Sequence, residues 1–183
     1  MQNKGRGTFI SFEGIDGSGK STQIELVKKY LHKNKKEVLF TREPGGTFEA
    51  ELIRKLILSK NKKIKFDNKT EILLLLAARY EHYKKLIEPA ITNGKIIICD
   101  RFIDSTLAYQ CAGNNELKEF YFQISKLLIN NFEPDLTILL DISPITAILV
   151  KASSSKYFAD LFNSPTEIIS LFCSTILSCI IKL

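Results

Sequence analysis

One octapeptide governs the fold of this chain: Gly14-Ile-Asp-Gly-Ser-Gly-Lys20-Ser21, which fits the pattern G-x-x-x-x-G-K-[S/T]. Glycines in such a turn allow backbone conformations that point successive N–H groups inward around phosphate oxygens. A helix that starts at the lysine adds the positive end of its dipole at the same place. The lysine can reach the outer phosphates, and the serine hydroxyl can hold Mg²⁺. The octapeptide therefore predicts a loop that binds a nucleoside triphosphate.

The segments around this loop alternate between strand and helix patterns. Strand patterns occur at 8–12, 37–41, 95–99 and 136–140, and helical spacing occurs at 21–33, 48–58, 70–88 and 116–131. Pro89 and Asn93-Gly94 predict the end of the helix over 70–88, and its leucine run at 73–76 is expected to cross the core. The alternation predicts an α/β fold of three layers, the fold of P-loop nucleoside triphosphatases, with a central parallel sheet flanked by helices. Polar or glycine-rich loops follow the strands, and ligands bind at that edge of such sheets.

Length and composition indicate a single domain over residues 1–183, with 45% hydrophobic residues to build its core. The net charge is +6, but 21 of the 26 basic residues are lysines that lie mostly at helix ends. This distribution favours a solvated surface over a nucleic-acid footprint, and an RNA-binding module is the weakest alternative. Residues 1–7 lack the apolar core of a signal peptide, and 168–181 is short for a membrane span. We expect a cytoplasmic protein with neither nucleic acid nor a membrane as a partner.

The cysteines and histidines suggest no metal centre. The four cysteines lack the C-x-x-C spacing of a zinc site and are expected to be reduced thiols. Cys99 is expected in the core, whereas Cys111 follows Gln110 and approaches the predicted pocket. His32 is expected to be exposed. For His82, a surface or site-rim position and a functional role both stay open.

The arginines carry more information. In a lysine-rich chain, four of the five arginines flank the predicted strand ends: Arg42, Arg54, Arg79 and Arg101. Guanidinium groups at such positions suggest forks for phosphates or base edges, and ordinary surface arginines are the alternative. The base-reading N-K-x-D segment of GTPases is absent from the second half of the sequence, which counts against that class.

Four segments, taken together, resemble the thymidylate kinases. They are Phe12-Glu-Gly-Ile-Asp-Gly-Ser-Gly-Lys-Ser-Thr22, Thr41-Arg-Glu-Pro-Gly-Gly-Thr47, Asp100-Arg-Phe-Ile-Asp-Ser-Thr-Leu-Ala-Tyr-Gln110 and Pro134-Asp-Leu-Thr-Ile-Leu-Leu-Asp141. They occur in the order and spacing of that family, from about residue 8 to residue 145. The resemblance implies that the chain uses ATP and Mg²⁺ to phosphorylate dTMP to dTDP, a step toward dTTP in pyrimidine deoxynucleotide synthesis. It also implies a homodimer that forms through the helix over 70–88 and its neighbours.

The resemblance assigns the donor side of the reaction to the phosphate loop and the residues beside it. The predicted ATP-binding residues are Gly14, Ile15, Asp16, Gly17, Ser18, Gly19, Lys20, Ser21 and Thr22. The predicted catalytic residues are Lys20, Asp100 and Arg101, and the predicted metal-binding residues are Ser21 and Asp100.

On the acceptor side, the resemblance implies a clamp on the dTMP phosphate, formed by Arg54 and Arg101. Asp16 would contact the sugar 3′-hydroxyl, Arg79 would read the thymine edge, and Glu43 would form an acidic pair with Asp100. The complete set of predicted substrate-binding residues is Asp16, Glu43, Arg54, Leu75, Arg79, Arg101, Thr106, Tyr109 and Gln110.

Three departures from the family keep other readings open. Leu75 replaces an aromatic ring that would stack on thymine, and Gly17 stands where one subgroup has a catalytic arginine. The other subgroup has that arginine in a lid, and the lid-like segment of this chain, at about 149–160, offers only lysines. From about Leu149 the resemblance fades, and the apolar tail at 161–183 suggests a truncated or frameshifted C-terminus. The alternatives are a catalytically impaired nucleotide-binding remnant and another P-loop nucleotide kinase.

Overall fold

The fold was analysed in a computed structural model that describes residues 6–61 and 63–141. Its centre is a parallel sheet with the strand order β2-β3-β1-β4. The strands are β1 (Thr8–Glu13), β2 (Val38–Arg42), β3 (Ile96–Asp100) and β4 (Leu136–Leu139). Asp100 lies opposite Phe12 of β1 and Arg42 of β2, so three strands end at one level. The predicted site therefore has a common edge of the sheet on which to assemble.

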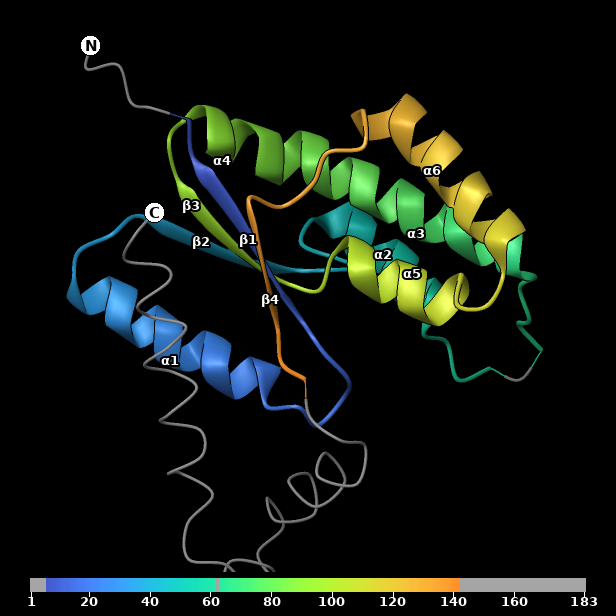
Figure 1. The fold of residues 1–183 in the computed structure, drawn as a ribbon, viewed down its shortest axis with the longest axis horizontal. Helices are drawn as coiled ribbons and strands as arrows, with labels where there is room; N and C mark the ends of the chain where they lie inside the picture. The colour runs from blue at the N-terminus through green and yellow to red at the C-terminus, as the bar shows by residue number, and fades with distance from the viewer. Residues whose placement is uncertain (1–5, 62, 142–183) are drawn as a thin grey trace, which may run out of the picture.

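Helices cover both faces of this sheet, which confirms the predicted three-layer α/β fold (Figure 1). Helix α1 (Lys20–Lys33) lies on one face, and the remaining helices gather on the other side. These are α2 (Phe48–Ile57), α3 (Asn68–His82), the π-helical segment η1 (Tyr83–Ile87), α4 (Glu88–Thr92), α5 (Ile103–Gln110) and α6 (Asn115–Ile129).

Alternating side chains of the central strands fill two apolar clusters, one on each face. Phe9 and Cys99 pack beneath α3, α4 and α6, which confirms the core position expected for the cysteine. Phe12 and Ile98 pack on the opposite face against Val27 of α1. A strand that is covered on both faces must be apolar throughout, and this explains the continuous run of isoleucines in β3.

The long helix differs from the prediction. It begins at Asn68, because the Asp67 carboxylate accepts hydrogen bonds from the first backbone N–H groups, and it continues past Pro89 to Thr92. Proline has no N–H and crowds the carbonyl four residues earlier. That carbonyl belongs to Lys85, which lies within η1, and the wider π-helical turn lets the helix pass the proline. The prediction that Pro89 ends this unit was wrong.

The leucine run of α3 does not cross the core as a whole. Leu75 and Leu76 are buried, but Leu73 is 45% exposed. The sequence analysis also gave no helix for α5, which presents Thr106, Tyr109 and Gln110 to the predicted site.

None of the described helices has the length and apolar character needed to cross a bilayer. The lid-like segment at 149–160 and the tail at 161–183 lie outside the described residues.

Candidate active site

The phosphate loop lies between β1 and α1, as predicted. Gly14 has a φ of 142°, and a Cβ there would meet the Leu140 carbonyl oxygen at 2.7 Å. Gly19 has a φ of 86° and begins α1 without a side-chain cap. The first turn of α1 carries no acidic residue, so the positive end of its dipole is not neutralised locally. This end of the helix is suited to bind an anion.

Lys20 lies folded against this loop. Its Nζ donates hydrogen bonds to the carbonyl oxygens of Gly14, at 2.8 Å, and Ile15, at 2.9 Å. Burial lowers the pKa of Lys20, and the nearby positive charge of Arg101 lowers it further. An anionic phosphate at the loop would restore a counter-charge to this ammonium group. The other predicted ATP-binding residues surround it, with Asp16, Ser21 and Thr22 exposed to solvent.

Asp100 and Ser21 are the predicted metal ligands. The Oδ1 atom of Asp100 is buried and accepts no hydrogen bond from the described part of the chain. Such an orphaned carboxylate oxygen fits a hydrated divalent cation, and the exposed Ser21 hydroxyl lies in the first turn of α1. Among the described residues, no group of three or more His, Cys, Asp and Glu side chains could hold a metal alone. The residues therefore fit Mg²⁺ bound mainly by substrate phosphates, with one carboxylate and one hydroxyl from the protein.

A cavity of about 470 Å³ opens beside the phosphate loop and brings together all nine predicted substrate-binding residues. They come from the phosphate loop, the turns after β2 and β3, and helices α2, α3 and α5. They are Asp16, Glu43, Arg54, Leu75, Arg79, Arg101, Thr106, Tyr109 and Gln110. The sequence analysis did not identify the other residues of its wall: Pro44, Ile57, Leu58, Glu71, Phe102 and Ser105.

Arg101 lies where the phosphate loop meets this cavity. Its Nη2 pairs with the Asp16 carboxylate, and its Nη1 donates to the Ser105 hydroxyl at 2.9 Å. Its guanidinium lies 5.4 Å from the ring centroid of Tyr109. The backbone of Arg101 has a φ of 73°, which a residue other than glycine adopts only when its surroundings hold it there.

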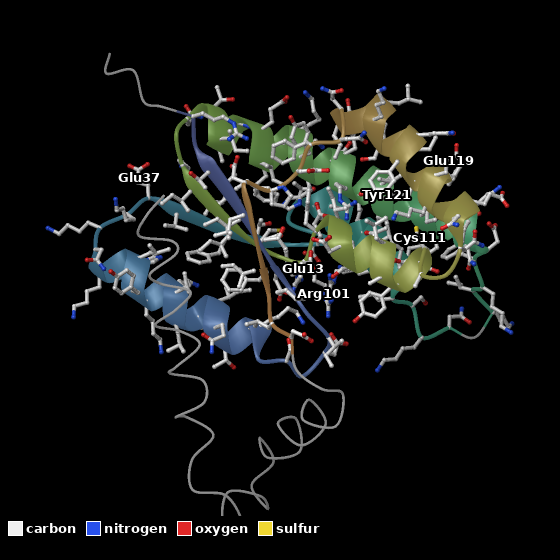
Figure 2. All side chains as sticks on the ribbon, in the orientation of Figure 1. Glu13, Glu37, Arg101, Cys111, Glu119 and Tyr121 are labelled. Carbon is white, nitrogen blue, oxygen red and sulfur yellow. The ribbon has the colours of Figure 1, made fainter. Side chains whose placement is uncertain are left out.

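Glu13 makes contacts that hold the Arg101 backbone in this conformation, although no role was predicted for it from the sequence. It lies at the end of β1, and its side chain accepts from the Phe102 backbone N–H and the Ser105 hydroxyl, each at 2.6 Å. Burial raises the pKa of the Glu13 carboxyl, and these two hydrogen bonds oppose that rise. Figure 2 shows Glu13 and Arg101 beside each other at this edge of the sheet. A carboxylate at the end of an apolar strand was the one sequence feature that could have indicated this role.

Arg54 reaches the cavity from α2. Its Nη1 donates to the Pro44 carbonyl oxygen at 2.6 Å, in the turn after β2. Burial lowers the pKa of Arg54, and the neighbouring charge of Arg42 acts in the same direction. Arg42 itself lies on the outside of the turn and forms an ion pair with Glu51 at 3.1 Å. Of the four arginines that flank strand ends, Arg42 alone is not part of the cavity wall in the described region.

Arg79 is buried at the inner end of the cavity, with its side chain 3% exposed. Its Nε donates to Glu43 Oε2 at 2.7 Å, and its Nη1 donates to the Tyr121 hydroxyl at 2.7 Å. Its Nη2 donates to the Phe102 carbonyl oxygen and the Thr106 hydroxyl, each at 3.0 Å. A guanidinium has five N–H groups. Four are bound by the described residues, which leave one N–H on Nη1 without a partner.

The remaining wall is partly apolar. Leu75 lies one helical turn before Arg79 and is 8% exposed. On the opposite side, Thr106, Tyr109 and Gln110 lie on one face of α5, and Gln110 donates to Glu71 at 2.9 Å. The cavity thus has both an apolar side chain and polar groups in its wall, a combination that suits a small heterocyclic ring.

The predictions for His82, His32 and Cys111 had different outcomes. His82 is completely buried and contacts both Glu43 and Thr41, so neither a surface nor a rim position holds. His32 is exposed, as predicted. Cys111 is buried in the apolar cluster beneath α6 and is not among the residues that line the described cavity.

Comparisons with known proteins agree with this geometry. The profile of the family described as thymidylate kinase matches residues 12–162. A thymidylate kinase of Orientia tsutsugamushi (strain Ikeda) is 47% identical over 148 residues, which cover 81% of this chain and 66% of the relative. One of Ruegeria pomeroyi is 46% identical over 144 residues, covering 79% and 67%. The chain thus spans about two thirds of the length of these curated relatives.

A solved structure gives the same result. The crystal structure of thymidylate kinase from Ehrlichia chaffeensis is 37% identical and superposes with a TM-score of 0.66, covering 84% of this chain and 90% of that one. The family profile extends to residue 162, so the expectation that the resemblance fades from about Leu149 was wrong in this respect. Both the profile, which matches most of the sequence, and the structural superposition identify the same family: the chain belongs to the thymidylate kinases.

Proposed function

We propose that this chain transfers the γ-phosphate of ATP to dTMP and so forms dTDP, a precursor of dTTP. One observation carries the proposal: the phosphate loop opens onto a cavity whose wall contains all nine residues predicted to bind the acceptor. Arg101 belongs to that wall and is close enough to influence the charge of Lys20. The donor and acceptor phosphates would therefore meet between these two cations.

The chemistry requires position and charge more than it requires a base. In phosphoryl transfer, the two phosphates must be brought into line while their repulsion is neutralised. The loop amides and Lys20 would hold the triphosphate, and Arg54 and Arg101 would hold the phosphate of dTMP. The acceptor oxygen is already anionic, so no residue has to remove a proton from it, and no covalent intermediate with the protein is needed.

Base recognition is assigned to the inner end of the cavity. The free Nη1 N–H of Arg79 can donate to a ring carbonyl, which thymine and uracil present at C4 and cytosine does not. Leu75 would pack on one face of the ring, and Thr106 and Gln110 would border its edge. Tyr109 would limit the space around the sugar, and Asp16 would contact the 3′-hydroxyl.

Magnesium is assigned to Asp100 and Ser21. When bound, Mg²⁺ would neutralise charge that develops on the β- and γ-phosphate oxygens. The buried Oδ1 of Asp100 would orient water on the ion, and Ser21 would contribute its hydroxyl from the start of α1. Glu43 is less suited to this task, since both of its oxygens are bound to Arg79 and His82.

We also propose a homodimer that forms through an apolar groove on the far side of α3. The groove has a volume of about 610 Å³ and is formed by residues of α2, α3 and α6. Its wall includes Leu52, Leu73 and Tyr80, each more than a third exposed. An exposed apolar patch of this kind marks an interaction surface more often than a solvated one. For the location we propose the cytoplasm, because both described cysteines are free thiols.

A coupled ADP-release assay tests the proposed activity. ADP should appear with Mg·ATP and dTMP together and stay at background without dTMP, and Lys20→Ala should abolish the signal. Calorimetric binding of dTMP without ADP release would favour the impaired remnant, whose basis is that Arg101 is the last arginine of the sequence. Preferential turnover of dUMP, dCMP or thymidine would instead indicate another nucleotide kinase.

A further inference from the structure

The imidazole of His82 has no part in the function proposed above, yet it lies within a chain of hydrogen bonds that ends at Arg79. Its side chain is 0% exposed, on the same face of α3 as Arg79 and three residues after it. A fully buried polar side chain is retained where its hydrogen bonds matter to the surroundings.

The contacts of His82 connect α3 to β2 and to Glu43, the residue that follows β2. His82 Nδ1 lies 2.9 Å from Glu43 Oε1, and its Nε2 lies 2.7 Å from the Thr41 hydroxyl. The other oxygen of Glu43 accepts from Arg79 Nε at 2.7 Å. The carboxylate is therefore held at both of its oxygens, by the guanidinium on one side and the imidazole on the other.

The chemistry of these groups fixes the direction of the hydrogen bond to Glu43. A carboxylate only accepts hydrogen bonds, so Nδ1 must carry a proton and donate it to Glu43. A neutral imidazole then has Nε2 as its acceptor, and the Thr41 hydroxyl donates to it. Arg79 and Glu43 balance each other's charge, and every polar atom of the imidazole has a partner.

The turn after β2 is built around this histidine. A Cβ on Gly46 would come within 2.5 Å of two ring atoms of His82 and 2.6 Å of the Thr41 hydroxyl. The second glycine of Pro44-Gly45-Gly46 is therefore required by the imidazole itself. The turn and the helix meet at this point as one packed unit.

Glu43 matters to Arg79 more than its other partners do. The partners of its Nη atoms are a carbonyl and two hydroxyls, all uncharged, whereas the bond to Glu43 is charge-assisted and fixes Nε. Without Glu43, only uncharged partners would hold the guanidinium, and the remaining N–H on Nη1 would be less fixed in direction.

We propose that His82 is a positioning residue: through Glu43 it fixes the Arg79 guanidinium in the orientation that selects a pyrimidine with a carbonyl at C4. The inference rests on the proposed function, because it assigns base recognition to Arg79. The inference concerns only one ring nitrogen, Nδ1. An experiment can therefore distinguish it from a structural role of the whole histidine side chain.

Two variants of the full chain, each with an amide in place of the imidazole, form the test. His82→Asn keeps a donor at the position of Nδ1, and His82→Gln keeps a polar group at the position of Nε2 but none that meets Glu43. Each variant loses one of the two hydrogen bonds, so their thermal stabilities should be similar. Binding of dTMP, dCMP and ATP is measured by calorimetry, which does not depend on turnover.

We expect His82→Gln to bind dTMP about tenfold more weakly and to lose about tenfold in its preference for dTMP over dCMP, a change of about 1.4 kcal/mol in each case. His82→Asn should stay within about twofold of the wild type, and the affinity for ATP should not change in either variant.

Equal loss in both variants, or no loss in either, would overturn the positioning role while leaving dTMP binding by the wild type intact. If the wild type binds dTMP but does not prefer it to dCMP, Arg79 does not select the base, and the inference is also overturned. If the wild type does not bind dTMP at all, the proposed function fails and the inference fails with it.

Discussion

Glu13 places a negative charge at the end of an otherwise apolar strand and uses it to shape the neighbouring turn. Its two hydrogen bonds fix the backbone of Phe102 and the hydroxyl that Arg101 contacts. The left-handed backbone of Arg101 costs free energy, on the order of 1–3 kcal/mol, and these contacts offset it. The direction of the Arg101 guanidinium, which we propose binds the acceptor phosphate, therefore depends on a residue that does not line the cavity.

We predict that Glu13→Gln weakens dTMP binding by about tenfold, or about 1.4 kcal/mol. The two donors meet different oxygens of Glu13, and in a glutamine one of these positions becomes an NH2 group. If the amide oxygen stays on the Phe102 N–H, the NH2 group can only donate to the Ser105 hydroxyl, and the negative charge that strengthens both hydrogen bonds is lost. Calorimetry with dTMP checks the loss. Ser105→Ala is the matched control: it keeps the carboxylate, removes the link to Arg101, and should lower dTMP affinity by a smaller factor. Unchanged dTMP affinity in Glu13→Gln would show that the turn at Arg101 keeps its conformation without the Glu13 carboxylate.

Leu75 gives a prediction in the opposite direction. It borders the cavity where a planar base would lie, and a leucine offers contact area but no aromatic face. Leu75→Phe should tighten dTMP binding by about 0.5–1.5 kcal/mol, roughly 2- to 12-fold, through stacking. Leu75→Met is the control, since it keeps a flexible apolar side chain without a ring. If both variants bind dTMP alike, the base does not lie against this position.

Much of the site could be predicted at this scale, and one part could not. The motifs end on neighbouring strands of one sheet, so their side chains had to converge, and the nine predicted acceptor residues do share a cavity. The pairing of Glu43 with His82 joins residues 39 positions apart, through side-chain directions that no local pattern records. For the same reason the burial of His82 could not be foreseen.

The elements that carry these residues depend on their end groups. Helix α3 positions Leu75 and Arg79, and it begins at Asp67, whose carboxylate accepts from the backbone N–H groups of Lys69 and Thr70 at 3.0 and 3.1 Å. The Thr70 hydroxyl also donates to it and is the main cause of the lowered pKa of Asp67. A side-chain cap of this kind stabilises the first turn of a helix.

We predict that Asp67→Ala lowers the melting temperature by about 2–4 °C, the shift typical of losing one cap in a chain of this size. Asp67→Asn should retain most of the stability at neutral pH, because an amide oxygen also caps. The folded-state pKa of Asp67 lies below its ordinary value of 3.8, so its charge contributes stability above pH 3.8 that is lost as the pH falls through the folded-state pKa. The advantage of the wild type over Asp67→Asn should therefore shrink as the pH falls below 3.8, and thermal melts at pH 7 and at a series of acidic pH values would check this. A difference that persists in acid would contradict the charge contribution.

The presence of helices and strands was easier to predict than the irregularities within them. All four strands appear within one residue of their predicted bounds. For the central strands β1 and β3 the reason is that a largely apolar run buried on both faces is typical of a parallel strand. The passage of the long helix through Pro89 was missed, since the sequence rule for proline assumes α-helical geometry and η1 is π-helical. Helix α5 was missed for a different reason: its polar face lines the cavity, so it lacks an ordinary amphipathic pattern.

For the molecule as a whole, the unexplained feature is the surplus of apolar side chains on α3. One stripe of the helix packs on the sheet, and a second stripe, with Leu73, Ala77 and Tyr80, faces away from it into the groove between α2 and α6. Helices with two apolar stripes are covered on both sides. The second stripe therefore needs a partner of similar apolar character, and in the dimer proposed above a second copy of the chain would provide one through two-fold symmetry.

We predict that the full chain is a dimer at micromolar concentration and that Leu73→Glu converts it to a species of 20.8 kDa, the mass of one chain, in sedimentation velocity. A two-fold axis through the groove would bring two introduced carboxylates together and desolvate both, which costs far more than the apolar contact they replace. Leu139→Glu is the control, because Leu139 is 63% exposed on the edge strand β4 and does not line the groove. The mutated position lies on the outer stripe of α3, so the monomer should still bind dTMP, and a loss of binding would mean that the acceptor cavity needs the second subunit. A monomeric wild type, or a dimer that survives Leu73→Glu and dissociates with Leu139→Glu, would place the interface elsewhere.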